Sequence, residues 1–297
     1  MDKGDWRQGA VVGNTLQVLM DRYLAEVSPL KRSASDQFHF RQIGRHPIAT
    51  FEVKRLTAEA VVSFRDSRLK QVSPATVRKE MNLISQVLRH ATSEWGLCLA
   101  VNPVAQVKKP AAPKGRERRI SDEEANALLL AFRKTRNPLV KQVFLFAIAT
   151  GMRRGEILSL TWEQVDIEKR TAHLPMTKNG EARTVPLSPA ALGLLSERKT
   201  HEGGHVFPIT RNALRLSWDR LRARAKVEDL RFHDLRHEAI SRFFEFGLSV
   251  PEVALISGHK DVKMLFRYTH LKPDAVAEKL HEVTASPVKA PEKTTPA

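Results

Sequence analysis

Hydrophobic residues in about the first hundred positions recur with the spacing of several amphipathic helices. Apolar residues return at helical intervals over residues 15–26 and again in a helix that begins at Thr57. A further helix is expected before Pro47, and Ser73 followed by Pro74 has the pattern of a helix cap and first turn. The pattern predicts an α-helical bundle.

A second folded region is expected to begin with a helix at about residue 121. Ser121 is followed three residues later by Glu124, which is the spacing of a capping box. Residues 138–150 are strongly apolar and stop at Gly151, so they predict a buried helix that ends in a glycine turn.

A short hairpin follows this buried helix. Residues 171–174 and 184–187 have strand character and flank Asn179 and Gly180, two residue types that can take the positive φ of a type I′ turn. The predicted fold class is therefore mainly α with a small β-sheet (α+β).

Residues 231–270 predict three short helices, and the first carries two polar side chains on one flank. It runs over about residues 232–246, with apolar residues returning at helical intervals as an inward stripe. His233 and Arg236 lie three residues apart and therefore project from the same side.

The next two helices position a histidine and a tyrosine. The second helix is expected to end at Gly258, so that His259 is held by a tight turn. Asp261 can cap the third helix, which carries Tyr268 and is expected to be short, with few packing contacts of its own. A helix of this kind suits a tyrosine side chain that moves into and out of a site.

The charge of the chain favours a polyanionic partner. Its 297 residues include 49 Lys and Arg against 33 Asp and Glu, a formal net charge of +16, and nucleic acid is the commonest partner of so basic a protein. The opening MDKGDWRQGA lacks the apolar core of a signal peptide, and no apolar run approaches the ~20 residues of a membrane span. We expect a cytoplasmic protein of a bacterium, associated with the nucleoid when bound to DNA. Cys98 is the single cysteine, so no disulfide forms within the chain.

The stretch VKKPAAPKGRERRI marks the boundary between two domains. Its prolines, glycine and basic residues predict an extended, solvated strap that lies against DNA. The predicted division is a helical DNA-clamping domain over residues 1–107, a basic linker over 108–120, a second domain over 121–285 and a disordered tail over 286–297. The candidate DNA-binding residues are those of the linker and two on a basic helix after Pro208: Lys108, Lys109, Lys114, Arg116, Arg118, Arg119, Arg211 and Arg215.

Several motifs together resemble the tyrosine recombinases, also called the phage integrase family. FHDLRHEAIS, ISGH and RYTH match the pattern His-x-x-Arg, then Gly-His, then a tyrosine nine residues on. TGMRRGEILSLTW resembles the segment with the first catalytic arginine, and TKNGEARTVPL resembles the hairpin with the catalytic lysine. Within the family, the chain is most similar to the shufflon-specific DNA invertases of plasmids. The resemblance implies a core-binding domain followed by a catalytic domain.

The resemblance assigns a nucleophile and two arginines. Tyr268 would attack a DNA phosphate and form a covalent 3′-phosphotyrosine, which stores the bond energy for rejoining. Arg153 and Arg236 would stabilise the negative charge that develops on the phosphate oxygens. Arg153 is the match to the family's first arginine, with Arg154 as the alternative.

The resemblance also assigns the proton transfers and the partners. His233 would accept the phenolic proton, Lys178 would donate a proton to the leaving 5′ oxygen, and His259 would hydrogen-bond a phosphate oxygen. No cofactor and no metal is implied. The implied partners are double-stranded DNA with specific recombination sites, three further copies of the chain in a homotetramer, and accessory DNA-bending proteins.

Alternative readings remain for the site and for the function. His233 and His237 lie four residues apart, as in a metal site, but Asp234 stands where a zincin has glutamate and Arg236 adds a cation to the same flank. DNA relaxation like that of a type IB topoisomerase and a DNA-binding regulator that does not cleave are the alternative functions. Integration, excision and inversion all remain open, and so does docking of the carboxy-terminal helix in cis or on a neighbouring subunit.

Overall fold

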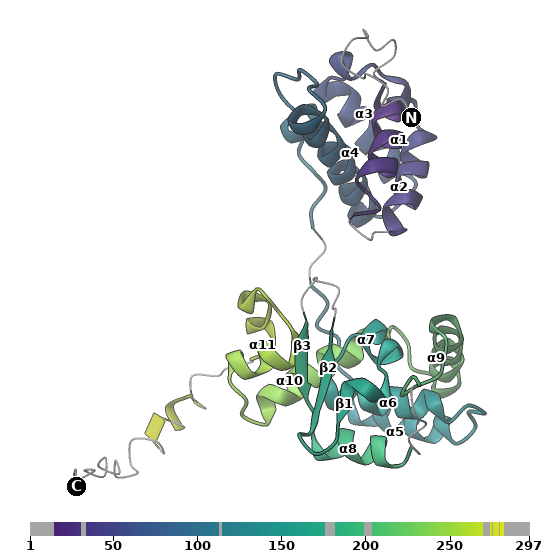
Figure 1. The fold of residues 1–297 in the computed structure, drawn as a ribbon, viewed down its shortest axis with the longest axis vertical. Helices are drawn as coiled ribbons and strands as arrows, with labels where there is room; N and C mark the ends of the chain where they lie inside the picture. Colours follow the sequence, from purple (N-terminus) through teal and green to yellow (C-terminus); the bar gives the residue numbers. More distant parts are fainter. Residues whose placement is uncertain are drawn as a thin grey trace, which may run out of the picture. The chain divides into compact units, whose positions relative to one another are not determined.

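The chain divides into two compact units in a computed structural model. The division falls between residues 115 and 116 (Figure 1). The residues that the structure describes are 15–30, 34–112, 115–175, 182–198, 204–269, 274, 276–278, 280 and 281. No helix among them is long and apolar enough to cross a membrane.

The amino-terminal unit is a helical bundle, as predicted. Its α-helices are α1 (Leu16–Glu26), α2 (Ala34–Gly44), α3 (Ala58–Leu69) and α4 (Pro74–Glu94), and its 3₁₀ helices are η1 (Pro47–Thr50), η2 (Val53–Arg55) and η3 (Pro103–Gln106). The side chains of Thr15, Thr57 and Ser73 accept hydrogen bonds from backbone N–H groups in the first turns of α1, α3 and α4. These caps fix where the helices begin.

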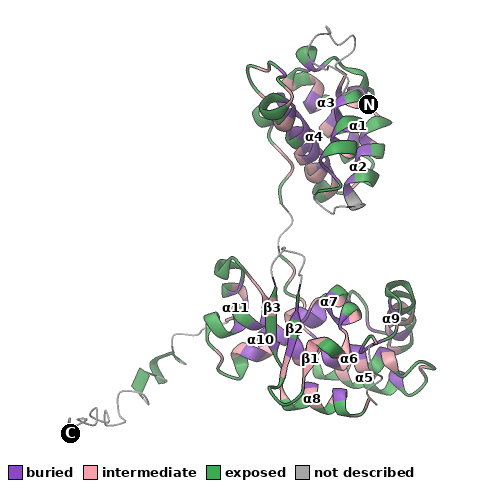
Figure 2. Cartoon of the chain, in the orientation of Figure 1, coloured by how far each residue is buried: buried purple, intermediate pink, exposed green. Residues whose placement is uncertain are grey.

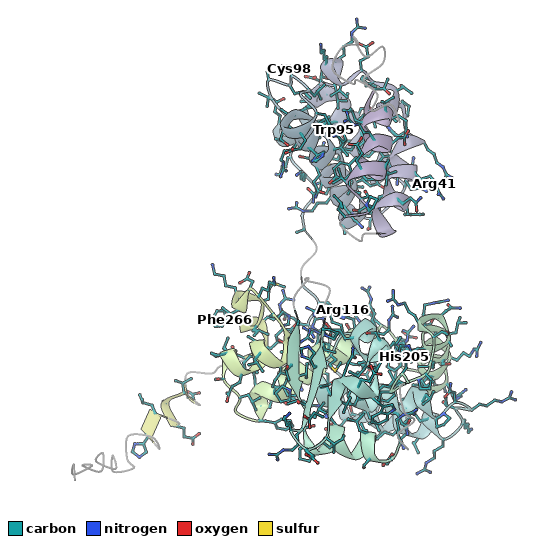
Figure 3. The ribbon with its side chains drawn as sticks, viewed as in Figure 1. Arg41, Trp95, Cys98, Arg116, His205 and Phe266 are labelled. Carbon is teal, nitrogen blue, oxygen red and sulfur yellow. The ribbon has the colours of Figure 1, made fainter. Side chains whose placement is uncertain are left out.

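A buried ion pair crosses the bundle between α3 and α4. Arg68 Nε and Nη2 donate to the two carboxylate oxygens of Glu80 at 2.9 and 2.7 Å, and Glu80 is 1% exposed. The hydrophobic residues around the pair form a continuous core, which Figure 2 shows as buried segments facing inward. Cys98 lies exposed on this unit (Figure 3).

The second unit combines helices with a small sheet. Its helices are α5 (Asp122–Phe132), α6 (Leu139–Thr150), α7 (Arg154–Ser159), η4 (Trp162–Gln164), α8 (Pro189–Ser196), α9 (Arg211–Ala225), α10 (Asp234–Glu245), α11 (Val250–Ser257), η5 (Val262–Met264) and η6 (Phe266–Tyr268). Its strands are β1 (Val165–Asp166), β2 (Thr171–Leu174) and β3 (Arg183–Pro186). The capping box of Ser121 and Glu124 at the start of α5 is confirmed.

The sheet is antiparallel in the order β1-β2-β3, and the strands of the predicted hairpin are paired. Ala172 lies opposite Val185, and both are fully buried under the neighbouring helices. The predicted turn at Asn179 and Gly180 lies outside the described residues. Because α11 lies beside β3 (Figure 1), the sheet edge reaches the polar residues that follow α11.

The apolar helix α6 is the centre of this unit. It packs against both α8 and α10, and Gly151 ends it with φ of 62°, as the sequence predicts. A Cβ at Gly151 would lie 3.2 Å from the ring of Phe243, so the absence of a side chain allows α10 to approach the end of α6 closely. This close approach brings residues of α10 next to the turn that leads to Arg153.

Candidate active site

Arg236 is a buried arginine whose guanidinium is fixed by two helix ends. The residue lies on α10 and is 4% exposed. Its two Nη atoms donate to the carbonyl oxygens of Gly151, at the end of α6, and of Ser257, at the end of α11, each at 2.6 Å. The carbonyls at helix carboxy termini carry partial negative charge, so they hold the cation in one position. Burial, and after it the charge of Arg153, lowers the pKa of Arg236 to about 9, which leaves the group protonated at pH 7.

Arg153 is held by the buried carboxylate of Glu156. Glu156 Oε1 accepts from Arg153 Nη1 at 2.8 Å, and Oε2 accepts from the backbone N–H of Arg153 at 2.7 Å. The same carboxylate accepts two hydrogen bonds from Arg183 on β3, both at 2.8 Å. Burial raises the pKa of Glu156, but the hydrogen bonds from Arg183 and Arg153 outweigh burial and bring the pKa to about 2. One anion therefore ties Arg153 to the strand at the end of the hairpin.

The two candidates for the first arginine point to different places. Arg153 lies close enough to Arg236 and His259 for its charge to lower the pKa of both groups. Arg154 instead lines a small pocket with Trp218 and Arg231, next to α9. The structure thus brings Arg153 beside the other candidate catalytic groups.

His259 is held by the turn that ends α11. Gly258 has φ of 70°, and the Nδ1 atom of His259 lies 2.7 Å from the hydroxyl oxygen of Ser257. Burial, followed by the charges of Arg236 and Arg153, lowers the pKa of His259 to about 4. The imidazole is therefore neutral at pH 7, and a bound phosphate would raise its pKa by compensating the two arginines.

Tyr268 is buried beside His237. It lies on the short helix η6, and its side chain is 5% exposed. Its ring stacks on that of His237, with centroids 5.7 Å apart and ring planes 24° apart. The phenolic oxygen lies 2.5 Å from Nδ1 of His237. Burial raises the pKa of Tyr268, and the charges of Arg267 and Arg236 oppose that rise.

The partner of the phenol is a residue that the sequence pattern did not single out as catalytic. His237 follows Arg236 directly and lies one helical turn after His233, whose ring meets it edge-on with centroids 5.1 Å apart. The spacing of the two histidines predicts that they lie on one flank of α10. From the sequence, a metal site was the function considered for this pair. The contact with Tyr268 spans 31 residues of sequence, so helical periodicity had no means of indicating it.

Two of the candidate residues lie outside the described residues. Lys178 belongs to the segment between β2 and β3, and Lys114 belongs to the predicted linker. Among the residues that the structure describes, no group of three His, Cys, Asp or Glu side chains is arranged to hold a metal ion.

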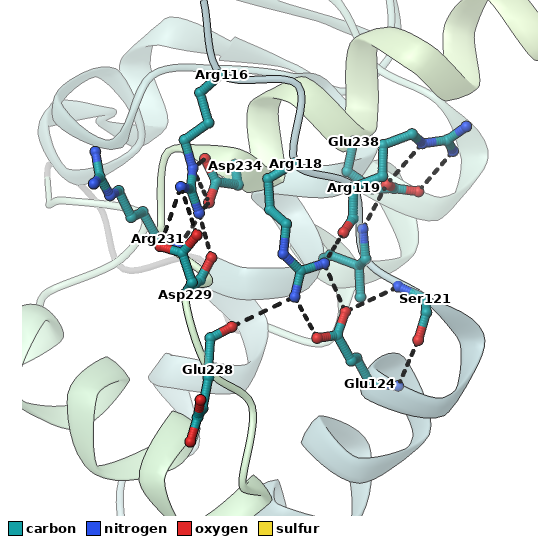
Figure 4. A network of polar contacts seen from close by, with 11 residues as sticks. Arg116, Arg118, Arg119, Ser121, Glu124, Glu228, Asp229, Arg231, Asp234 and Glu238 are labelled. Carbon is teal, nitrogen blue, oxygen red and sulfur yellow. Dashed lines mark hydrogen bonds and ion pairs between the residues drawn. The ribbon is translucent and has the colours of Figure 1, made fainter.

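The linker arginines form ion pairs with acidic residues of the second unit (Figure 4). Arg116 donates to both carboxylate oxygens of Asp234 at 2.8 and 2.9 Å and also pairs with Asp229 at 3.0 Å. Arg118 pairs with Glu124 in the first turn of α5. The expected solvated strap is thus attached, from Arg116 onward, to the protein surface.

Arg119 extends the same network to the next turn of α10. It donates to both oxygens of Glu238 at 3.1 and 3.2 Å and pairs with Glu245. Asp234 and Glu238 are each 1% exposed, and losing the partner of a buried charge costs about 3–5 kcal/mol. These carboxylates flank Arg236 and His237 in the sequence, so the linker holds the helix that carries the site.

The other candidate DNA-binding residues are less constrained. Lys108 is exposed, and Lys109 Nζ donates to Asn82 in the amino-terminal unit at 2.8 Å. Arg211 is exposed at the start of α9, and Arg215 on the same helix is exposed and pairs with Asp219 at 3.3 Å.

Comparison with known proteins relates most of the chain to one family. A model of the phage integrase family matches residues 118–274. The shufflon-specific DNA recombinase of Escherichia coli is 41% identical over 276 residues, which are 90% of this chain and 71% of that protein. A putative integrase/recombinase of Haemophilus influenzae is 34% identical over 266 residues, which are 87% of this chain and 87% of that protein.

Solved structures share the fold at lower identity. The integrase of the Tn1549 transposon, in complex with a circular intermediate DNA, has a TM-score of 0.70 at 15% identity, covering 91% of this chain and 100% of that chain. A lambda integrase tetramer bound to a Holliday junction has a TM-score of 0.63 at 18% identity, covering 87% of this chain and 83% of that chain.

Proposed function

The chain belongs to the phage integrase family, and we propose that it is a site-specific recombinase that cuts and rejoins DNA through a 3′-phosphotyrosine at Tyr268. The observation that carries the proposal is the clustering of a buried phenol with fixed cations. Tyr268 lies within the electrostatic influence of Arg236, which in turn lies beside Arg153 and His259. An attacking oxygen and the charges that a phosphate requires are thus in one place.

The two arginines would stabilise the transition state. Attack on a DNA phosphate places extra negative charge on the nonbridging oxygens, and preorganised cations lower the energy of that state without moving during the reaction. Arg236 is preorganised by two helix ends and Arg153 by Glu156. The guanidiniums replace the divalent ions that serve this purpose in other phosphoryl-transfer sites.

The proton transfers complete the proposed mechanism. Lys178 would deliver a proton to the departing 5′ oxygen, and His259 would hydrogen-bond a phosphate oxygen once DNA is bound. The sequence assigns the acceptance of the phenolic proton to His233, which lies at the start of α10 beside His237. That assignment stays a prediction.

The nucleophile is tested with a nicked DNA substrate that traps the cleaved state. The protein should form a covalent adduct that survives SDS, Tyr268→Phe should form none, and Tyr23→Phe should form as much as the unaltered protein. Tyr23 is a matched control because it is the other tyrosine of the chain and is buried in the amino-terminal unit. An adduct that persists in Tyr268→Phe would refute the assignment, as would cleavage that stops when EDTA is added.

The alternative functions differ in their DNA requirements. A relaxing topoisomerase acts on any supercoiled plasmid, whereas the proposed recombinase requires its own sites. A regulator that does not cleave would form no adduct at all. Because the relative from Escherichia coli is named for shufflon recombination, we propose that this chain inverts DNA between inverted sites. Plasmids with sites in direct and in inverted orientation distinguish inversion from excision.

We further propose that the active assembly is a homotetramer joined by carboxy-terminal segments. An apolar cavity of about 890 Å³ opens on the second unit, with Leu129, Phe144 and Phe246 among its lining residues. Val276 and Leu280 are 46% and 63% exposed near the end of the described chain, four residues apart as on one helix face. These two side chains match the apolar character of the cavity in a second copy.

Light scattering of the protein on DNA with paired sites tests the assembly. The unaltered chain should give four copies per pair of sites, and Val276→Asp with Leu280→Asp should give only separately bound copies. Tetramers of that variant would exclude docking by these residues. In a bacterial cell, the DNA-bound assembly would be found with the nucleoid.

A further inference from the structure

We propose that His237 accepts the proton of the Tyr268 phenol when the tyrosine attacks DNA, an inference that rests on the proposed function of Tyr268 as nucleophile. His237 is the residue whose ring nitrogen lies 2.5 Å from the phenolic oxygen. It is therefore in direct contact with the atom that would form the new bond to phosphorus. Geometry within hydrogen-bond reach is the first requirement for a general base.

The contact is built by the packing of two short elements. α10 carries His237 immediately after the immobilised Arg236, and η6 packs against α10 with Tyr268 at its end. The rings of His237 and Tyr268 are stacked, and in this arrangement the phenolic oxygen lies beside Nδ1. The proposal requires the phenol to be the donor, which is the case when the neutral ring carries its own proton on Nε2.

The surroundings keep His237 unprotonated before DNA binds. Burial first, and then the charges of His233, Arg267 and Arg236, lower the pKa of His237 to about 4 against the opposing charge of Asp234. His259 also lies within electrostatic range of the ring. At pH 7, therefore, Nδ1 has a free lone pair for the phenolic proton.

DNA binding would make this weak base stronger. A phosphate held by Arg236 and Arg153 adds negative charge beside the cations that depress the pKa of His237, so the pKa rises towards the value of an ordinary histidine. The proton acceptor is thereby activated when a substrate phosphate is in place. In the absence of DNA, the same contact stabilises the neutral, unreactive phenol.

The proposed step balances without a further reactant. The phenolic O–H bond breaks and its proton passes to Nδ1 of His237, while the phenolic oxygen forms a bond to phosphorus. The bond from phosphorus to the 5′ oxygen breaks, and that oxygen takes a proton from Lys178 as proposed above. During rejoining, the 5′ hydroxyl attacks phosphorus and gives its proton back to Lys178, while the bond from phosphorus to the phenolic oxygen breaks and His237 returns its proton to that oxygen.

Cleavage rates with two nicked substrates show whether a residue acts as the general base or as the general acid. One substrate has the ordinary 5′ oxygen at the scissile bond, and the other has 5′ sulfur, which leaves without needing a proton. His237→Ala should lower single-turnover adduct formation by about 10²- to 10⁴-fold on both substrates, the usual range for an acid or base. Lys178→Ala should be slow only with the oxygen substrate. His205→Ala, which alters an exposed histidine of the same unit (Figure 3), should keep the unaltered rate on both.

The pH dependence of adduct formation identifies the group that removes the phenolic proton of Tyr268. Without His237, the reaction depends on the fraction of Tyr268 that is ionised. At pH values below the pKa of the tyrosine, this fraction increases tenfold for each unit by which the pH rises. Adduct formation by His237→Ala should therefore rise about tenfold per unit between pH 6 and pH 9. The unaltered protein should vary little above about pH 7.5, because His237 is largely unprotonated there even when a bound phosphate has raised its pKa from about 4 towards the ordinary value of about 6.5. His233→Ala should also vary little.

His237→Asn distinguishes proton transfer from mere placement of the tyrosine. The amide oxygen of asparagine can accept the hydrogen bond of the phenol, yet it cannot take its proton at neutral pH. The Asn variant should be as slow as the Ala variant, with the same pH slope and with DNA affinity and melting temperature close to those of the unaltered protein.

Three results would overturn the assignment of His237. They are an Asn variant with the unaltered rate, rescue of His237→Ala by the sulfur substrate, and a steep pH slope in His233→Ala with none in His237→Ala. The proposed function fails separately, because its failure is an adduct that persists in Tyr268→Phe.

Discussion

At the scale of single residues, Glu156 connects three parts of the site. Its carboxylate accepts hydrogen bonds from the side chain and the backbone of Arg153 and from the guanidinium of Arg183. It is 7% exposed, so its negative charge is screened little by water. The folded protein therefore depends on Glu156 remaining ionised.

The depressed pKa of Glu156 predicts a specific loss of stability in acid. Folding lowers this pKa from 4.5 to about 2, so the stabilisation is complete above about pH 4.5 and is lost as the pH falls through 2. The loss amounts to about 3 kcal/mol, since each pKa unit corresponds to about 1.4 kcal/mol. Glu156→Gln should be less stable at pH 7 and should lose about 3 kcal/mol less than the unaltered protein between pH 5 and pH 2. Urea denaturation at several pH values measures this, and equal acid losses in both proteins would contradict the prediction.

Sequence identified some residues of the site and missed others for a physical reason. Arg236, His259 and Tyr268 were found because each occupies a motif of fixed spacing, and the structure brings them into one neighbourhood. His237 was passed over because its role depends on which side chain reaches it across the fold. Ionic contacts of the linker were missed likewise, since a run of arginines does not reveal its acidic partners.

At the scale of elements, the site is assembled from helix ends. Gly151 ends α6, Ser257 ends α11, and Arg153 precedes α7. Helix ends expose backbone groups with a fixed direction and partial charge, and turns hold the following side chain rigidly. The candidate catalytic groups are therefore positioned by backbone geometry that is already set before any ligand arrives.

Gly258 and Gly247 form a matched pair for testing the role of one such turn. Both have positive φ, 70° and 85°, so alanine at either position should cost about 1–2 kcal/mol. A Cβ at Gly258 would lie 2.9 Å from Cδ of Arg183, whereas nothing lies within 4 Å of a Cβ at Gly247. Because Arg183 is held by Glu156, it cannot move away freely.

We expect Gly258→Ala to reduce DNA cleavage and Gly247→Ala to leave it nearly unchanged. The displaced Arg183 and His259 would lower the rate by about tenfold or more, because small misplacements of catalytic groups are costly. Thermal melting and single-turnover cleavage of both variants provide the measurement. Equal cleavage rates would show that the approach of this turn to Arg183 has no catalytic consequence.

At the scale of the whole molecule, a net charge of +16 matches the proposed DNA partner. Part of that charge is compensated internally, since Arg116, Arg118 and Arg119 all have carboxylate partners. Lys108 is exposed just before these residues and is a candidate phosphate contact. The linker thus combines residues that hold α10 with a residue available to DNA.

The salt dependence of DNA affinity tests the role assigned to Lys108. Each phosphate contact contributes a slope of about −0.9 to the plot of log affinity against log salt concentration. Lys108→Ala should therefore make the slope less negative by about 0.9, while Lys169→Ala should not alter it. Lys169 is the control because it is an exposed lysine, paired with Asp166 at 3.1 Å. Fluorescence anisotropy at several salt concentrations measures both slopes, and equal slopes would remove Lys108 from the interface.

The sequence by itself determined most of the longer helices, the hairpin strands, the family and most candidate catalytic residues. These features depend on local periodicity, on capping side chains and on motifs of fixed spacing, all of which are present along the chain. Only the tertiary structure decided that Tyr268 is buried against His237, that Glu156 joins Arg153 to Arg183, and that the linker arginines pair with α10. Those contacts join residues far apart in sequence, and their energies depend on burial and distance, which exist only after the chain has folded.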